Sequence, residues 1–232
     1  VKAVHDVSFE VKKGEIFGFA GLVGAGRTEV ARALFGADPH TAGDIYVHGK
    51  KVSIKSATDA VKNGIGYLSE DRKQFGLLLD KDLSFNTGMA AMDHFTNATV
   101  VATKKLRDVA KDYVAKLRTR TPSVDVEVRS LSGGNQQKVV VAKWLERDTD
   151  ILIFDEPTRG IDVGAKDEIY TLLENLAQQG KAIIVISSEL PEVLRLANRI
   201  AVMAHGRIIG VLDNEEATQE NIMELATVGQ EE

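Results

Sequence analysis

The segment from Glu15 to about Phe35 constrains the fold of this chain more than any other. Glu15 to Ala20 is a nearly continuous apolar run, which predicts a buried strand, and the glycine-rich loop after it leads into an amphipathic helix. This order is typical of a phosphate-binding loop, because glycines let backbone N–H groups converge on an anion at the helix start. The alternative is a glycine loop without a ligand. The candidate nucleotide-binding residues are Gly21, Gly24, Ala25, Gly26, Arg27 and Thr28.

The last two residues of this loop differ in how well they suit a nucleotide. The hydroxyl of Thr28 can ligate Mg²⁺. Arg27 stands where such a loop normally has lysine, and its guanidinium keeps the positive charge but is longer and planar. We therefore expect weak but real nucleotide binding.

Two adjacent carboxylates, Asp155 and Glu156, follow the wholly apolar run 151–154. Such a run predicts a strand buried on both faces, and ligands bind at the C-terminal ends of strands in open α/β sheets. Asp155 is therefore the second candidate metal ligand beside Thr28, and Glu156 is the candidate base that polarises the attacking water. Two merely solvated carboxylates are the alternative.

A second anion-binding feature is predicted at residues 131–138, Leu-Ser-Gly-Gly-Asn-Gln-Gln-Lys, which precede the helix-compatible segment 139–145. The small residues Ser132, Gly133 and Gly134 leave backbone N–H groups bare at a helix N-terminus, where the helix dipole favours a phosphate. The alternative is an ordinary Ser-Gly-Gly turn that caps a helix.

The remaining pattern predicts the fold class. Strands alternate with helices, which indicates an α/β protein with a mostly parallel sheet. A hairpin over 44–54 adds an antiparallel β layer, and 4–11 alternates as a half-buried strand does. We expect one domain over 1–232, with a core at 1–76 and 131–232 and an inserted helical subdomain at about 77–130.

Composition excludes several classes of protein. The chain has 232 residues, a formal charge of -5 and no cysteine, so disulfides and thiolate metal sites are ruled out. A general nucleic-acid surface needs clustered Lys and Arg, which are lacking, and no apolar run reaches the ~18 residues of a membrane span. Because the chain opens on Val1 partway into a strand-like pattern, we interpret it as an excised piece of a longer protein.

Five motifs together resemble one family, the ATP-binding cassette (ABC) ATPases. The chain is most similar to the C-terminal ATP-binding domain of the tandem ATPase subunits of bacterial monosaccharide importers, of the ribose, xylose and galactose type. The resemblance covers nearly all of the chain and rests on residues 21–29, 69–73, 131–138, 155–166 and 187–193.

This resemblance implies ATP and Mg²⁺ as cofactors and a position at the cytoplasmic side of the cell membrane. It implies that Ser132, Gly133, Gly134 and Gln136 form a signature loop that binds the nucleotide held by a partner domain, and that Asp162 contacts that partner. The implied partners are an N-terminal ABC domain of the same polypeptide, membrane permease subunits and, indirectly, a sugar-binding protein. No nucleic acid is expected.

Three positions depart from the general ABC pattern. Arg27 replaces lysine, Glu70 stands where a glutamine normally reads the metal and the attacking water, and Ser188 stands where a histidine contacts the γ-phosphate. The loss of these transition-state contacts predicts a pocket that holds ATP but hydrolyses it slowly. A module that never hydrolyses ATP and docks its helical subdomain on a partner is the alternative.

Other charged and aromatic residues receive simpler interpretations. We expect Glu15 to be a solvated charge and Trp144 to be a core anchor, while His205 is a hairpin residue. The segment 74–92 is expected to face the membrane subunits, with Arg72 and Lys73 as docking charges beside it. A solvated surface loop is the alternative there.

Overall fold

The computed structural model describes residues 4–97 and 100–229, and its contacts divide the chain into two units. The sheet unit comprises Val1–Tyr67, Asp150–Pro157 and Leu173–Glu232, and the helical unit comprises Leu68–Thr149 and Thr158–Leu172. This division follows spatial contacts, so the predicted limits of an inserted subdomain at 77 and 130 stay a prediction.

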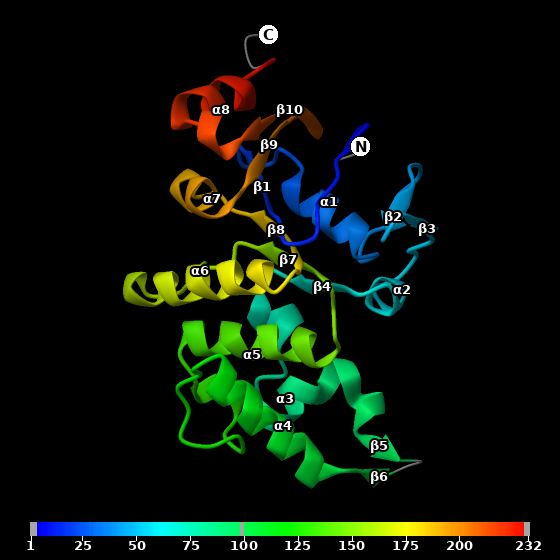
Figure 1. Ribbon diagram of the computed structural model, residues 1–232, viewed down its shortest axis with the longest axis vertical. Coiled ribbons are helices and arrows are strands. Elements are labelled where there is room, and N and C mark those ends of the chain that lie inside the picture. The colour runs from blue at the N-terminus through cyan, green and yellow to red at the C-terminus, as the bar shows by residue number, and fades with distance from the viewer. Residues whose placement is uncertain (1–3, 98–99, 230–232) are drawn as a thin grey trace. The chain divides into compact units, whose positions relative to one another are not determined.

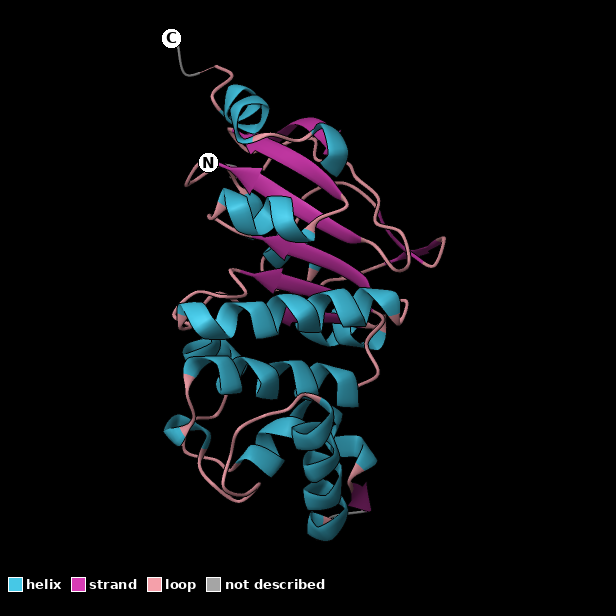
Figure 2. Ribbon diagram, turned by 60° about the vertical axis from the view of Figure 1, so that its left-hand side comes forward, coloured by secondary structure: helices cyan, strands magenta, loops and turns pink. Residues whose placement is uncertain are grey.

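The sheet unit is built on a six-stranded sheet with the order β10-β9-β1-β8-β7-β4 (Figures 1 and 2). Strand β1 pairs in parallel with β8 and β9, and β7 pairs in parallel with β8. The edge strand β10 pairs with β9 in the antiparallel sense. The mostly parallel sheet predicted from the sequence is therefore confirmed. Its strands are β1 (Ile16–Gly21), β4 (Ile65–Leu68), β7 (Ile151–Asp155), β8 (Ala182–Ile186), β9 (Arg199–Ala204) and β10 (Arg207–Asp213).

A two-stranded antiparallel sheet and short helices complete this unit. The predicted hairpin over 44–54 is confirmed in shortened form as β2 (Ile45–Val47) and β3 (Lys50–Val52). Ser56 caps α2 (Ala57–Lys62) by accepting a hydrogen bond from the backbone N of Asp59, because its hydroxyl replaces a missing helical acceptor. The other helices are α1 (Arg27–Leu34), α7 (Leu190–Leu196), the 3-10 helix η4 (Asn214–Glu216) and α8 (Gln219–Ala226).

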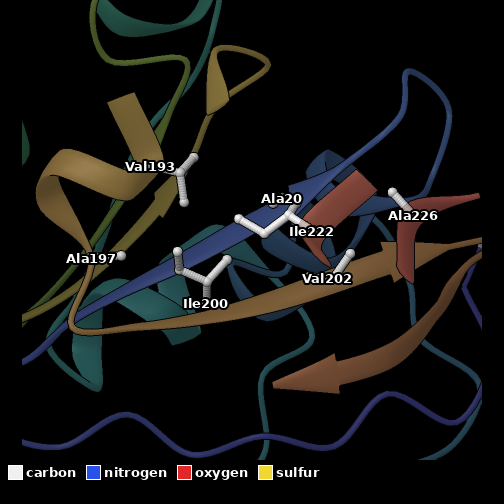
Figure 3. Packing of buried hydrophobic residues seen from close by; sticks show 7 residues of the cluster. All are labelled: Ala20, Val193, Ala197, Ile200, Val202, Ile222 and Ala226. Carbon is white, nitrogen blue, oxygen red and sulfur yellow. The ribbon is translucent and has the colours of Figure 1, made fainter. Parts of the chain in front are cut away.

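Helices α7 and α8 bury an apolar cluster against β1 and β9, close to where β1 ends (Figure 3). In this cluster Ile222 of α8 lies over Ala20, the last residue before the glycine loop. Burial of such a side chain stabilises the fold by roughly 1.5–3 kcal/mol. The cluster consists of Ala20, Val193, Ala197, Ile200, Val202, Ile222 and Ala226.

The strand predicted over 4–11 is wrong, although its alternation of burial is right. Residues Val7, Phe9 and Val11 are half-buried between exposed neighbours, and the ring of Phe9 stacks on Phe17 of β1 with centroids 5.4 Å apart. No strand forms over 4–11, and Asp6 has φ 48°, which lies outside extended geometry. Aromatic packing and separate hydrogen bonds, such as that from the backbone N of His5 to Gly206 O at 2.7 Å, hold this segment to the sheet in place of a strand ladder.

Glu15 is not the solvated charge that the sequence suggested. Its side chain is buried, accepts hydrogen bonds from Arg199 Nε at 2.7 Å and Nη2 at 3.2 Å, and also accepts from the backbone N of Lys12. Burial alone would raise the pKa of Glu15, but the hydrogen bonds and charges of Arg199 and Lys12 outweigh it and lower that pKa. The sequence did not reveal the partner because Arg199 belongs to β9.

We expect Glu15→Gln to lower the free energy of unfolding by about 1.5–3 kcal/mol at neutral pH, because the charged hydrogen bonds to Arg199 are lost. Since the folded pKa is lowered, this contribution is present above the ordinary value of 4.5 and is lost as pH falls through the folded pKa. Urea unfolding of both proteins at pH 7 and at about pH 3 measures it. A difference between variants that persists undiminished at low pH would contradict the ion pair.

The helical unit contains the elements from η1 to α5 and the first part of α6. The chain from 82 to 117 is mostly helical, in line with the helical character predicted for about 77–130, but a small hairpin, β5–β6, interrupts it. Residues 98 and 99 lie outside the described residues. Trp144 is buried, as expected for a core anchor. The elements are η1 (Arg72–Gly76, a π-helical turn), α3 (Leu83–Gly88), η2 (Met89–His94), β5 (Thr96–Asn97), β6 (Val100–Val101), α4 (Thr103–Lys116), η3 (Val128–Ser130), α5 (Gly133–Glu146) and α6 (Val163–Gln178).

Within the described parts of the chain, none of the helices has the length and apolarity that crossing a bilayer requires.

Candidate functional site

The glycine loop begins where β1 ends, and its backbone geometry requires glycine there. Gly21 has φ 148°, and a Cβ on it would lie 2.4 Å from the carbonyl oxygen of Met203. Gly26, with φ 100°, is the N-cap of α1, and no side chain caps this helix. The first turn of α1 therefore presents backbone N–H groups without a side-chain acceptor, which suits a phosphate.

Arg27 lies at the base of this loop, with only 8% of its surface exposed. Its Nη1 donates to two backbone carbonyls, Gly21 O at 2.6 Å and Ser187 O at 3.0 Å. Burial lowers the pKa of Arg27, and the carboxylates of Glu156 and Asp155 oppose that change. The guanidinium thus links the end of β1 to the residue after β8 through a single nitrogen.

The structure brings together Thr28 and Asp155, the two predicted metal ligands. Thr28 Oγ1 donates to Asp155 Oδ1 at 3.2 Å, and burial raises the pKa of Asp155. A hydroxyl and a carboxylate are hard oxygen donors that fit Mg²⁺. No cluster of three His, Asp or Glu side chains within 4–97 and 100–229 could hold a metal alone, so nucleotide phosphates would complete the coordination.

Tyr67, on β4, is a site residue that sequence reasoning missed. Its hydroxyl donates to Asp155 Oδ2 at 2.8 Å, so each oxygen of this carboxylate has a different donor. Burial, followed by the charge of Asp155, raises the pKa of Tyr67. The only signal in the sequence was a phenol in an otherwise apolar strand, Ile65–Leu68.

We expect Tyr67→Phe to weaken Mg²⁺-dependent ATP binding about tenfold, because a carboxylate that lacks its second donor is oriented less firmly toward the metal. ATP binding without Mg²⁺ should be unchanged. Calorimetric titrations with ATP at several Mg²⁺ concentrations measure both, and Tyr46→Phe, at an exposed residue of β2, is the matched control. Equal loss with and without Mg²⁺ would mean that Tyr67 serves the fold rather than the metal site.

Glu156, the candidate base, and Ser188 lie in direct contact. The backbone N of Ser188 donates to Glu156 Oε1 at 2.7 Å, and its hydroxyl donates to Oε2 at 3.0 Å. Glu156 has φ 51°, a left-handed conformation that directs the side chain away from the strand axis. Burial raises the pKa of Glu156, while both hydrogen bonds from Ser188 lower it. Each carboxylate oxygen of Glu156 thus has one donor from Ser188, and the pKa of Glu156 is raised overall because burial outweighs these hydrogen bonds.

Helix α8, which the sequence analysis did not foresee, lines a cavity beside these residues. The cavity has a volume of about 180 Å³ and is bounded by the glycine loop and by α7 and α8. Its lining residues are Gly21, Leu22, Val23, Arg27, Ser188, Leu190, Ile222, Met223 and Ala226.

In the helical unit, the second predicted anion-binding segment forms the start of α5. Ser132 is the exposed N-cap residue, and its hydroxyl accepts from Asn135 Nδ2 at 2.8 Å instead of from the backbone of α5. The first turn, which begins with Gly133 and Gly134, is therefore not capped by a side chain. Gln136 differs from the other three predicted residues, because it is buried and its Nε2 donates to Val128 O at 3.2 Å. Its amide nitrogen links α5 to η3, while its Oε1 is buried without a hydrogen-bond partner among the described residues.

The remaining predicted residues also belong to the helical unit. Glu70 forms an ion pair with Arg159, and Asp162 is exposed just before α6. Arg72, predicted as a docking charge, is only 8% exposed in the π-helical turn η1, whereas Lys73 beside it is exposed. The alternative of a solvated position is wrong for Arg72, because its guanidinium is bonded to backbone carbonyls within the unit, while the docking role of this segment stays a prediction.

The sheet, the uncapped glycine loop and the Thr28–Asp155 pair define a nucleotide-binding domain of the P-loop type. The family model described as ABC transporter matches residues 4–159. The chain therefore belongs to the ABC transporter family.

Similar proteins carry a more specific name. The chain is 62% identical over 227 residues to the "Putative ribose/galactose/methyl galactoside import ATP-binding protein 1" of Burkholderia lata, covering 97% of this chain and 44% of that protein. A relative of Geobacillus kaustophilus, whose name also begins "Putative ribose/galactose/methyl galactoside import ATP-binding protein", is 54% identical, with 96% and 44% coverage. The chain thus spans less than half the length of these relatives.

Solved structures agree on the fold. An ATP-binding cassette of an ABC transporter superposes with a TM-score of 0.80 at 21% identity, covering 96% of this chain and 92% of that one. A dimeric cassette in a post-hydrolysis state, bound to ADP and Pi, superposes with a TM-score of 0.77 at 21% identity, with 91% and 90% coverage. At this identity the likeness establishes the ABC-type fold.

Proposed function

We propose that this chain is the C-terminal ATP-binding domain of a tandem ATPase that powers import of a monosaccharide. Its relatives are named as ribose/galactose/methyl galactoside import ATP-binding proteins, and they are more than twice as long as the chain. Its signature loop completes the ATP site of the partner domain, while its own pocket binds MgATP and hydrolyses it slowly.

The observation that carries this proposal is the state of the side chains around Glu156. Arg27 is buried and its Nη1 is bonded to two carbonyls, and Ser188 donates to both oxygens of Glu156. The arginine thus donates to the backbone, and the candidate base is already hydrogen-bonded to Ser188, whereas catalysis needs both groups for the reacting phosphate and water. The start of α5, by contrast, keeps its first turn uncapped, as an anion site requires.

The proposed partners follow from this assignment. The N-terminal ABC domain of the same polypeptide supplies the competent ATP site. The membrane permease subunits are the partners whose transport cycle this ATPase drives. A sugar-binding protein delivers the sugar to those subunits. The domain would act at the cytoplasmic face of the membrane, as a peripheral component.

We expect the isolated domain to bind MgATP and to turn it over at least 10²-fold more slowly than the assembled importer, because removal of one transition-state contact already costs about that much. Calorimetry measures binding, and a phosphate-release assay measures turnover. Arg27→Ala, which removes a buried side chain of the glycine loop, is the control in the calorimetric measurement of MgATP binding.

Vigorous turnover by the isolated domain, abolished by Glu156→Gln, would contradict the degenerate pocket. If neither the isolated domain nor the importer depends on this chain's signature loop for hydrolysis, the non-hydrolysing docking module is the better description.

A further inference from the structure

The segment 69–76 carries buried and exposed charges that the proposed function does not use. Asp71 shapes it, because its Oδ1 accepts from the backbone N of Lys73 at 3.1 Å and of Gln74 at 3.0 Å and caps the π-helical turn η1. Within this turn Arg72 is buried and Lys73 is exposed.

Arg72 bonds to two successive carbonyls of the loop that follows Pro157. Its Nη1 donates to Arg159 O at 2.9 Å and its Nη2 to Gly160 O at 3.4 Å. Arg72 Nη2 and Gly160 O also lie against the first turn of α5. A Cβ on Gly133 would be 2.6 Å from each of these two atoms. Arg72, the loop and the tip of α5 therefore meet at one point, where only glycine fits on the helix.

The energetics of this contact do not favour an arginine on grounds of stability. Its acceptors are two neutral carbonyls, and its Nε is buried without a hydrogen-bond partner among the described residues. Burial also lowers the pKa of Arg72. A buried charge of this kind is often replaced by an apolar side chain of similar volume with little loss of stability. An apolar side chain could not donate two hydrogen bonds in a fixed geometry to successive carbonyls, as the planar guanidinium does.

We infer that Arg72 is a positioning residue that fixes the loop 158–162 to the first turn of α5, so that both meet the partner ATP-binding domain in one geometry. The inference rests on the proposed function, in which the signature loop and Asp162 face that partner. The ion pair between Glu70 and Arg159 is a second link from the same segment. Because it is more exposed, it contributes less than the buried link.

The test compares Arg72→Met with the matched control Lys73→Met in the full-length protein. Arg72→Met is expected to speed amide hydrogen exchange about tenfold in 132–135 and 158–162, because loss of a charged hydrogen bond favours local opening by about that factor. The unfolding temperature should change little. In the assembled importer kcat should fall about tenfold with the KM for ATP unchanged, as for a contact needed only in the transition state. Lys73→Met should leave exchange in both segments at the wild-type rate.

Gly133→Ala tests the same contact from the helix, because its methyl group would separate Arg72 from Gly160. It should reproduce the faster exchange in 158–162. Unchanged exchange in both Arg72→Met and Gly133→Ala would overturn the inference. Faster exchange throughout the unit, together with a large fall in unfolding temperature, would also overturn it, because that result indicates a purely structural role. Faster local exchange with unchanged turnover would support the positioning role of Arg72 and contradict the proposed use of the signature loop.

Discussion

Replacing Gly134 with aspartate in the full-length protein is expected to lower ATP turnover by the assembled importer at least 10²-fold. The substitution places a negative charge in the first turn of α5, where the helix dipole and bare N–H groups would meet the γ-phosphate of the partner's nucleotide. Sterically it is tolerated, because a Cβ on Gly134 would have only ordinary contacts, 3.5 Å from Ala165 and 3.6 Å from Ile161. Steady-state ATPase rates of the reconstituted importer measure the effect.

Two comparisons separate charge from other causes. Gly134→Asn has nearly the same size without the charge and should retain far more turnover than Gly134→Asp. Glu156→Gln, in this domain's own pocket, should cost much less than Gly134→Asp. Equal damage from Glu156→Gln would show that both sites of the importer hydrolyse ATP.

Gly21→Ala is expected to destabilise the domain by about 3 kcal/mol or more and to abolish ATP binding. The new Cβ would lie 2.4 Å from a backbone oxygen, Met203 O, so β1 and β9 must separate where the glycine loop begins. Its φ of 148° adds backbone strain. For a chain of this length such a loss lowers the unfolding temperature by roughly 6–12 °C.

Gly24→Ala is the control for this substitution. Gly24 also has positive φ, 82°, but no atom lies within 4 Å of its Cβ position. It should therefore show only the strain of the left-handed conformation, about 1–2 kcal/mol. If Gly21→Ala and Gly24→Ala unfold at the same temperature, the close approach of Met203 O does not destabilise Gly21→Ala and this prediction is wrong. Thermal unfolding followed by circular dichroism suffices for this comparison.

The features that the sequence predicted well are those decided by neighbouring residues. The apolar run 151–154 directly precedes two carboxylates, and its burial on both faces follows from its composition alone. The glycine loop before α1 was likewise predicted from its own residues. The order of adjacent residues was enough to predict both features, although in the fold β7 pairs with β8 and Gly21 lies against Met203 of β9.

The features that it missed depend on distant partners. The residues around Glu15 do not indicate that Arg199 is its partner. Those around Tyr67 do not indicate that its hydroxyl donates to Asp155. Arg72 was misjudged because a run of charged residues usually lies in solvent, and only the fold brings carbonyls of the loop at 159 and 160 to its guanidinium. No strand forms over 4–11 for a related reason, because Phe9 packs on the rings of Phe17 and Phe19 in β1 without a strand ladder.

The position of β1 in the sheet sets the order in which a growing chain can mature. Ile16 pairs with Ile183 and Phe17 pairs with Arg199. Both edges of β1 therefore form their hydrogen bonds with residues that are synthesised much later. Until β8 and β9 leave the ribosome, β1 is an apolar strand with two open edges, a state prone to aggregation. Contacts this distant along the chain also slow folding once synthesis is complete. The nucleotide pocket can therefore be completed only after β8 and β9 have been synthesised, although the segment that begins it comes much earlier in the domain.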